Sequence, residues 1–104
     1  MARVRVSTTA DADIVRILAA IAREAGGATA RKFNARFEAL FDTLEAFPDS
    51  CPARPALGLH IRVGVVYPYL VIHRHVPGED DDVVGIVRIL HGRRRITRKL
   101  VNDN

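Results

Sequence analysis

The sequence contains few of the residues that cross-link a protein or anchor it in a membrane. Its 104 residues include no Trp, one Cys and one Met. The lone Cys51 excludes an internal disulfide, so the cysteine content gives no sign of an oxidising compartment. No apolar run approaches the ~20 residues that a membrane-spanning helix needs, and no apolar segment of signal-peptide length follows the basic N-terminus. These absences predict a soluble, cytoplasmic protein.

Motifs that mark the common enzyme classes are also missing. The sequence has no Walker loop, no G-x-G-x-x-G run, no nucleophile elbow and no H-E-x-x-H pair. His73 and His75 alternate along one expected strand, but no Cys or carboxylate stands at a familiar ligand spacing from them. We therefore expect neither a metal site nor a cofactor.

The sequence does contain a large apolar fraction and a charge concentrated at one end. Hydrophobic residues make up 48% of the chain, which is enough for one core, and we expect a single domain over residues 1–104. Residues 1–82 hold ten Lys and Arg against eleven Asp and Glu, whereas residues 83–104 hold six against one. The net charge of +4 therefore arises after residue 82, which indicates an acidic partner at that end of the fold.

The first half of the sequence predicts a strand and two helices. Residues 3–6 alternate polar and apolar side chains, as a short strand does. Apolar residues then recur every three or four positions in two stretches separated by Gly26 and Gly27, which predicts two antiparallel helices. Thr8 is the expected N-cap of the first helix, and the second should end before Pro48.

The second half predicts a loop over residues 48–58 and strands over residues 59–66, 68–76 and 83–91. The acids Glu79–Asp82 read as a solvated hairpin tip rather than a cation site. The last strand is apolar on both faces and should be central. Strict alternation places Val83, Val87 and Ile89 on one face, and Val84, Ile86 and Leu90 on the other. The order β-α-α-β-β-β predicts an α+β fold with the helical hairpin on one face of a small, twisted, mainly antiparallel sheet.

Three strand residues are candidates for acid–base or phosphate chemistry. His91 ends the last strand three residues after Arg88, so the imidazole could move a proton while the guanidinium holds a phosphate. Arg62 would join them if the strand register is favourable. In the structural alternative, His91 satisfies backbone groups where the chain leaves the sheet, and Arg62 is a cross-strand partner for an acid.

Cations dominate the segment after the last strand, namely Arg93, Arg94, Arg95, Arg98 and Lys99. Such a patch can bind the phosphates of a nucleic acid, dock into an acidic groove of another protein, or simply be solvated. No aromatic residue is interleaved with these cations, so base stacking has no local support. We treat the patch as the candidate target-binding surface.

Several stretches together resemble those of a known family. They are a helical hairpin of about this length and the runs Leu59-His60-Ile61-Arg62-Val63, Tyr67-Pro68-Tyr69-Leu70-Val71-Ile72-His73-Arg74 and Val87-Arg88-Ile89-Leu90-His91-Gly92-Arg93-Arg94-Arg95-Ile96. In these the chain resembles the RelE/ParE superfamily of bacterial toxins from type II toxin–antitoxin modules, also called plasmid-stabilisation proteins. The resemblance covers nearly the whole chain, and the family's fold agrees with the predicted order of elements.

That resemblance implies one of two activities. RelE-like members are metal-independent, ribosome-dependent endoribonucleases that cut mRNA, often with a Tyr or a His–Tyr pair near the C-terminus. ParE-like members inhibit DNA gyrase. Arg62, Arg88 and His91 match positions used by RNA-cleaving members, but no Tyr follows His91. We therefore expect a ParE-like gyrase inhibitor, with a RelE-like nuclease and a non-toxic basic adaptor as the alternatives.

The resemblance also implies a cognate, ParD-like antitoxin in a hetero-oligomer. The antitoxin's C-terminal segment would fold along the toxin, and its DNA-binding part would connect the complex to operator DNA. No membrane partner is expected. The expected antitoxin contacts are apolar residues of the two helices, namely Ile14, Ile17, Leu18, Phe37, Leu40 and Phe41.

Overall fold

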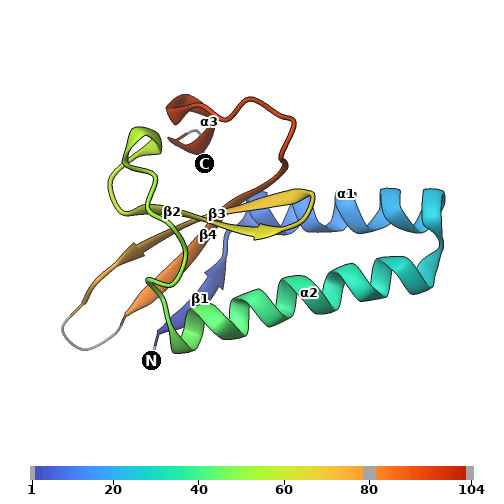
Figure 1. Cartoon of the computed structure of the whole chain (residues 1–104), viewed down its shortest axis with the longest axis horizontal. Helices are drawn as coiled ribbons and strands as arrows, with labels where there is room; N and C mark the ends of the chain where they lie inside the picture. Colours follow the sequence, from blue (N-terminus) through green and yellow to red (C-terminus); the bar gives the residue numbers. More distant parts are fainter. Residues whose placement is uncertain (1, 79–81, 103–104) are drawn as a thin grey trace.

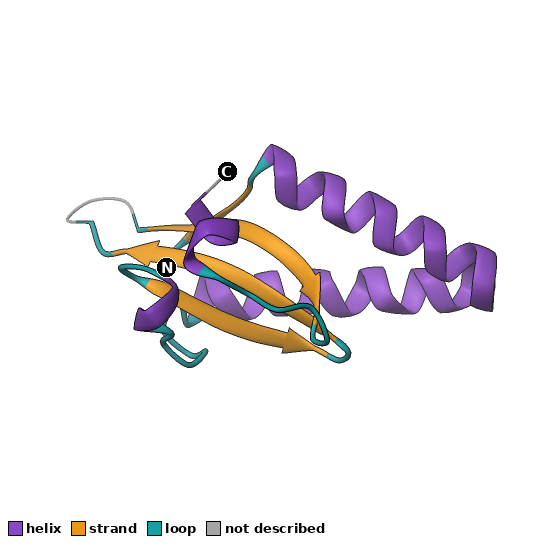
Figure 2. Ribbon diagram, turned by 90° about the horizontal axis from the view of Figure 1, so that it is seen from above, coloured by secondary structure: helices purple, strands orange, loops and turns teal. Residues whose placement is uncertain are grey.

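The computed structural model describes residues 2–78 and 82–102, so the acids 79–81 of the predicted hairpin tip lie outside the described residues. The elements in chain order are β1 (Arg3–Val6), α1 (Thr8–Ala25), α2 (Gly27–Ala46), η1 (Pro55–Leu57), β2 (Ile61–Val66), β3 (Tyr69–Val76), β4 (Val83–His91) and α3 (Arg98–Asn102). Helices α1 and α2 form an antiparallel hairpin that extends beyond one end of the sheet (Figures 1 and 2). None of the described helices is long and apolar enough to cross a membrane.

A serine and a glycine set the boundaries of the helical hairpin. Ser7, and not the predicted Thr8, is the N-cap of α1, because its hydroxyl accepts a hydrogen bond from the Ala10 amide at 3.0 Å. Gly26 ends α1 with φ at 92°, a left-handed conformation that favours glycine, and α2 begins at the next residue. The predicted pair of antiparallel helices is confirmed.

The four strands form one mixed sheet in the order β1-β4-β3-β2. Strands β2, β3 and β4 are antiparallel neighbours, whereas β1 lies parallel to β4 with Arg3 opposite Val83 and Val6 opposite Ile86. Strand β4 is therefore central, as its apolar character predicted. The expected α+β fold is confirmed, and the parallel β1–β4 pair makes the sheet mixed.

A bulge in β4 changes which of its residues face the helices. Ile72 of β3 lies opposite Arg88, but the following His73 lies opposite Ile86, so Val87 is an extra residue in the strand. The β4 side chains in the core beneath the helices are Val84, Ile86 and Ile89, and those in the core on the other face are Val87 and Leu90. The predicted odd–even division of this strand is wrong, because strict alternation does not allow for an inserted residue.

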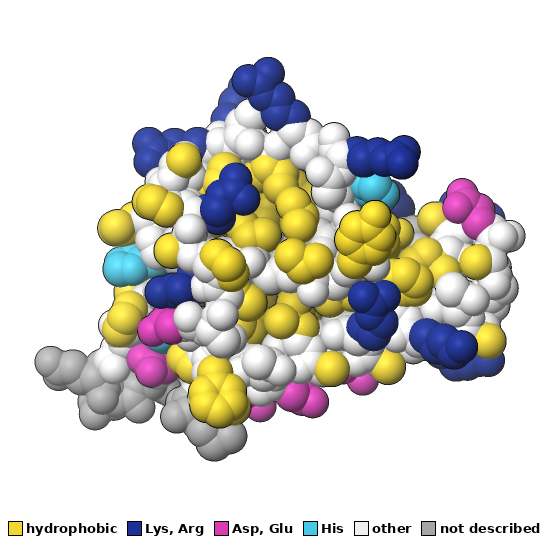
Figure 3. All heavy atoms as spheres, viewed as in Figure 1, with side chains coloured by type: hydrophobic (Ala, Val, Ile, Leu, Met, Phe, Trp, Pro, Cys, Tyr) yellow, Lys and Arg dark blue, Asp and Glu magenta, His cyan; other side chains and the backbone are white. Residues whose placement is uncertain are grey.

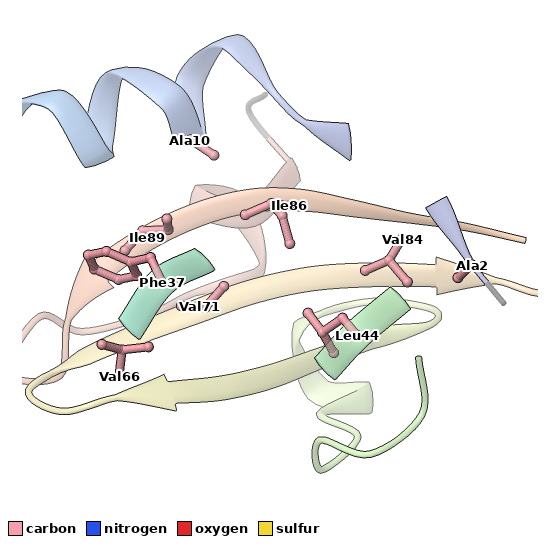
Figure 4. Packing of buried hydrophobic residues seen from close by; sticks show 9 residues of the cluster. All are labelled: Ala2, Ala10, Phe37, Leu44, Val66, Val71, Val84, Ile86 and Ile89. Carbon is pink, nitrogen blue, oxygen red and sulfur yellow. The ribbon is translucent and has the colours of Figure 1, made fainter. Parts of the chain in front are cut away.

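Apolar side chains cover both faces of the sheet. On one face Ala10 of α1 and both Phe37 and Leu44 of α2 pack against the strands, as Figure 4 shows. The other face carries a second cluster, which consists of Leu57, Ile61, Val63, Ile72, Val87, Leu90 and Val101. Helix α3 closes part of that second face, since Val101 is 1% exposed. The sheet thus lies between a long helical hairpin and a short C-terminal cover.

Candidate functional site

Arg88 is held by a buried carboxylate of α1. Asp13 is 1% exposed and accepts hydrogen bonds from Arg88 Nε at 2.8 Å and Arg88 Nη2 at 3.1 Å. It also accepts from the Ile89 amide at 3.0 Å and from Arg16 Nη2 at 2.7 Å. Both β4 groups that bind Asp13, the Arg88 side chain and the Ile89 amide, come directly after the bulge at Val87. Arg88 therefore joins the helix to the central strand.

The electrostatics of this pair are those of a permanent ion pair. Burial by itself would raise the pKa of Asp13, but the hydrogen bonds from Arg88, the Ile89 amide and Arg16 leave that pKa below its ordinary value. The hydrogen bond to Asp13 raises the pKa of Arg88 further above its already high value. Both groups stay charged at neutral pH, and the Arg88 side chain is only 13% exposed. Arg88 therefore offers little of its charge to a phosphate from outside.

Arg62, on the edge strand β2, is also held by contacts within the protein. Its Nη1 donates to the carbonyl oxygens of Cys51 at 2.7 Å and Asp49 at 3.1 Å, and its Nε lies 3.2 Å from the Asp49 carboxylate. The same carboxylate is 2.7 Å from His75 Nδ1. The hydrogen bond with His75 and the charges of His75 and Arg62 lower the pKa of Asp49. Arg62 thus fastens the loop after α2 to the sheet.

His91 is the last residue of β4 and lies beside a tyrosine. Tyr69 of β3 is directly opposite His91 in the strand register, and the two rings meet edge to face with 5.7 Å between their centroids. His91 Nδ1 accepts a hydrogen bond from the Arg93 amide at 3.0 Å, so the neutral ring carries its proton on Nε2. The structure therefore does not bring Arg62, Arg88 and His91 together, but it builds a His–Tyr pair from two neighbouring strands.

The C-terminal cations stand on a segment that is fixed to the sheet. Arg93, Arg94 and Arg95 are exposed and follow a turn in which the Gly92 amide donates to the Pro68 carbonyl at 2.8 Å. Arg98 and Lys99 are exposed on α3, whose other side packs on the core. On the face seen in Figure 3, Lys and Arg side chains surround an apolar area. The expected target-binding residues therefore form an outward-facing cationic edge.

The expected antitoxin contacts lie on the hairpin. Five of them are half-buried against the core beneath the helices, namely Ile14, Ile17, Leu18, Leu40 and Phe41. Phe37 is 1% exposed and belongs to that core. The part of this set that an antitoxin can reach is therefore the half-buried group.

Two of the other histidines, His73 and His75, are buried in the fold, whereas His60 is exposed. His73 is fully buried, with Nδ1 3.0 Å from the Val71 carbonyl, and burial lowers its pKa. His75 is 5% exposed beside Asp49. Within the described ranges, no three His, Cys, Asp or Glu side chains gather closely enough to hold a metal ion.

Comparisons with known proteins agree with this architecture. A family model described as the ParE toxin of the type II toxin–antitoxin system parDE matches residues 4–96. The chain belongs to the ParE toxin family. The fold is also similar to that of a chain in the solved structure "Chromosomal ParDE TA system from P. aeruginosa", with a TM-score of 0.69 and 20% identity over 88% of this chain and 96% of that one. No curated protein matches the sequence.

Two residues of this ParE-family chain escaped the sequence reasoning. Asp13 has a visible signal, because it stands within the apolar stripe of α1, three residues after Ala10 and four before Ile17. A carboxylate in such a stripe indicates a buried charged partner. Tyr69 has no comparable signal, since its approach to His91 depends on the register between β3 and β4.

Proposed function

We propose that this ParE-family toxin inhibits DNA gyrase and is neutralised by a ParD-like antitoxin in a hetero-oligomer. The observation that carries the choice of target is the engagement of the strand arginines. A phosphate clamp beside His91 would draw on Arg62 and Arg88, but Arg88 is bound to Asp13 and Arg62 to the loop at Asp49 and Cys51. This arrangement favours gyrase inhibition, which needs an intact binding surface, over RNA cleavage, which needs free arginines at a reaction centre.

The cationic edge supports the same choice. Arg93, Arg94, Arg95, Arg98 and Lys99 are exposed, and a gyrase–DNA complex presents a strongly negative surface to them. Cations held on a fixed segment speed encounter with such a partner and orient the approach.

A supercoiling assay tests the proposal directly. Purified toxin added to gyrase and relaxed plasmid should reduce supercoiling, and added antitoxin should restore it. Induction of the toxin in cells should arrest growth with blocked replication while transcripts stay intact. Codon-phased cuts in mRNA, mapped by primer extension and accompanied by normal supercoiling, would contradict the gyrase assignment.

The Tyr69–His91 pair supports a second candidate, a RelE-like mRNA endonuclease. Its ring centroids lie 5.7 Å apart, and His91 in its imidazolium form would supply the proton of a general acid beside the tyrosine hydroxyl. His91→Ala would then abolish RNA cleavage, and Tyr69→Phe, which keeps the ring packing and removes the hydroxyl, would weaken it strongly. For a gyrase inhibitor both variants should remain toxic. Primer extension on the two variants separates the candidates.

Operator binding is proposed for the complex and not for the toxin alone. A ParD-like antitoxin would supply the DNA-binding part, and the toxin would contribute through the hetero-oligomer. Gel-shift experiments with operator DNA should show binding by antitoxin and complex, and none of comparable specificity by the toxin.

A further inference from the structure

An open trough crosses the sheet on the face away from the helical hairpin. Its volume is about 650 Å³, and it lies between the β1 edge and α3. Five valines make its lining largely apolar, namely Val6, Val76, Val83, Val87 and Val101. No described residue that lines it is acidic or aromatic.

Two arginines stand on either side of the trough in one row of the sheet. Arg5 of β1 and Arg74 of β3 are both opposite Gly85 of β4, so the row runs Arg5, Gly85, Arg74. Paired residues on neighbouring strands point to the same face, and two strand spacings separate the arginine Cα atoms by roughly 10 Å. Neither arginine takes part in an ion pair among the described residues, although Arg74 Nε donates to the Leu59 carbonyl at 3.4 Å.

Gly85 keeps the middle of this row empty. A Cβ atom added there would meet nothing within 4 Å, and the backbone of Gly85 does not adopt a left-handed conformation. The strand itself therefore does not require glycine at this position. The space that its missing side chain leaves lies between two cations and above an apolar floor.

We infer that this trough binds an extended, acidic and aliphatic segment of the antitoxin, with a carboxylate between Arg5 and Arg74 and aliphatic side chains on Val83 and Val87. The inference rests on the proposed neutralisation by an antitoxin. A carboxylate matches the two guanidinium groups, and aliphatic neighbours match the valine lining. Nucleic acid matches less well, because bases stack on aromatic side chains and none lines the trough.

Affinity measurements with the full-length toxin and its antitoxin test this inference. Arg5→Glu with Arg74→Glu should weaken binding at least tenfold, because the variant repels a carboxylate. Gly85→Val should weaken it to a similar extent by filling the trough without changing charge, and Gly85→Ala should have a smaller effect. Arg54→Glu is the control for a charge reversal of half that size away from the trough, since Arg54 is exposed beside β2 at the opposite edge of the sheet, and it should bind as the wild type does.

Each outcome bears on one claim. Circular dichroism and thermal unfolding establish that the variants are folded. Wild-type antitoxin affinity in either the charge-reversal variant or Gly85→Val overturns the inference. The inference is also overturned if the variants lose only DNA binding or self-association and keep their affinity for the antitoxin. In cells, the trough variants should arrest growth even when antitoxin is co-expressed. If the wild-type toxin neither binds antitoxin nor arrests growth, the proposed function itself fails.

Discussion

Among single residues, Asp13 joins helix α1 to the central strand β4 through several hydrogen bonds. Its two carboxylate oxygens accept four hydrogen bonds, from two arginines and one backbone amide. A buried ion pair is costly to break because the remaining charge stays desolvated. Because the same hydrogen bonds occupy the Arg88 guanidinium, this side chain is not free to bind a phosphate.

Asp13→Asn should lower the free energy of unfolding by about 3 kcal/mol, since a neutral amide cannot balance the charge of the largely buried Arg88 guanidinium. Urea denaturation at neutral pH measures this loss. Asp42→Asn is the control, because Asp42 is exposed on α2, and its effect should stay within about 0.5 kcal/mol. Equal stabilities of the two variants would remove Asp13 from the stabilising contacts.

The same ion pair predicts how stability depends on acid. The folded-state pKa of Asp13 lies below its ordinary value of 3.8, so its contribution is complete above that value and is lost as pH falls through the folded pKa. The stability difference between wild type and Asp13→Asn should therefore be constant from pH 7 to about 5 and shrink below about 4. Urea denaturation across this pH range measures it, and a difference that persists unchanged in acid would contradict the assignment.

Among the elements, the C-terminal segment combines two tasks. Its apolar residues Ile96, Leu100 and Val101 cover the second core, while its cations face outward. Thr97 helps to begin α3, because its hydroxyl accepts a hydrogen bond from the Leu100 amide at 3.2 Å. The cationic segment after β4 thus covers the second core with its apolar residues and exposes its charges.

Changing Arg93, Arg94 and Arg95 together to Ala should weaken toxicity about tenfold or more and leave the fold intact, because these side chains are exposed. Survival after induction at matched protein level measures toxicity, and the effect should fade at higher salt in a purified assay. Full growth arrest by the triple variant would show that these cations serve only solubility or antitoxin contact.

Val101→Asp is the complementary change, because it places a charge in the second core where Val101 is 1% exposed. We expect a loss of about 3 kcal/mol or more in the free energy of unfolding, measured by urea denaturation. Lys99→Asp, two residues earlier on the exposed side of α3, should change stability little. Similar stabilities of the two variants would mean that α3 does not support the core.

The elements also show where sequence reasoning succeeds and where it ends. Periodicity located both helices and β4, because burial of one or both faces leaves a direct trace in the order of residues. It assigned the wrong faces within β4, since the bulge at Val87 is visible only in the register of β4 with β3. The separation of Arg62 and Arg88 was equally invisible, because it depends on which carboxylate each one meets in space.

In the whole molecule, candidate recognition residues lie on both faces of the sheet. The hairpin side carries the half-buried apolar residues expected to meet an antitoxin, and the other side carries the cationic edge and the trough. A single partner segment can reach both sides around the β1 edge, which borders the trough. Such wrapping should bury well over ~1,000 Å².

Antitoxin should therefore raise the stability of the toxin by mass action. At a free antitoxin concentration of about one hundred times Kd, the gain is about 2.7 kcal/mol, or roughly 10 °C in thermal midpoint for a domain of this size. Thermal unfolding at increasing antitoxin concentration measures the shift. A midpoint that does not move at micromolar antitoxin would contradict tight binding.

The parallel pairing of β1 with β4 also orders events during translation. Arg3 meets Val83, so the first strand to leave the ribosome has no neighbour in the sheet until the last strand follows it. The helical hairpin relies on local contacts and can form early, whereas Asp13 must wait for Arg88 and the Ile89 amide. A nascent chain stopped before β4 holds the helices but neither the central strand nor the cationic segment. The sheet therefore gains its central strand, and Asp13 its partners, only once β4 has been synthesised.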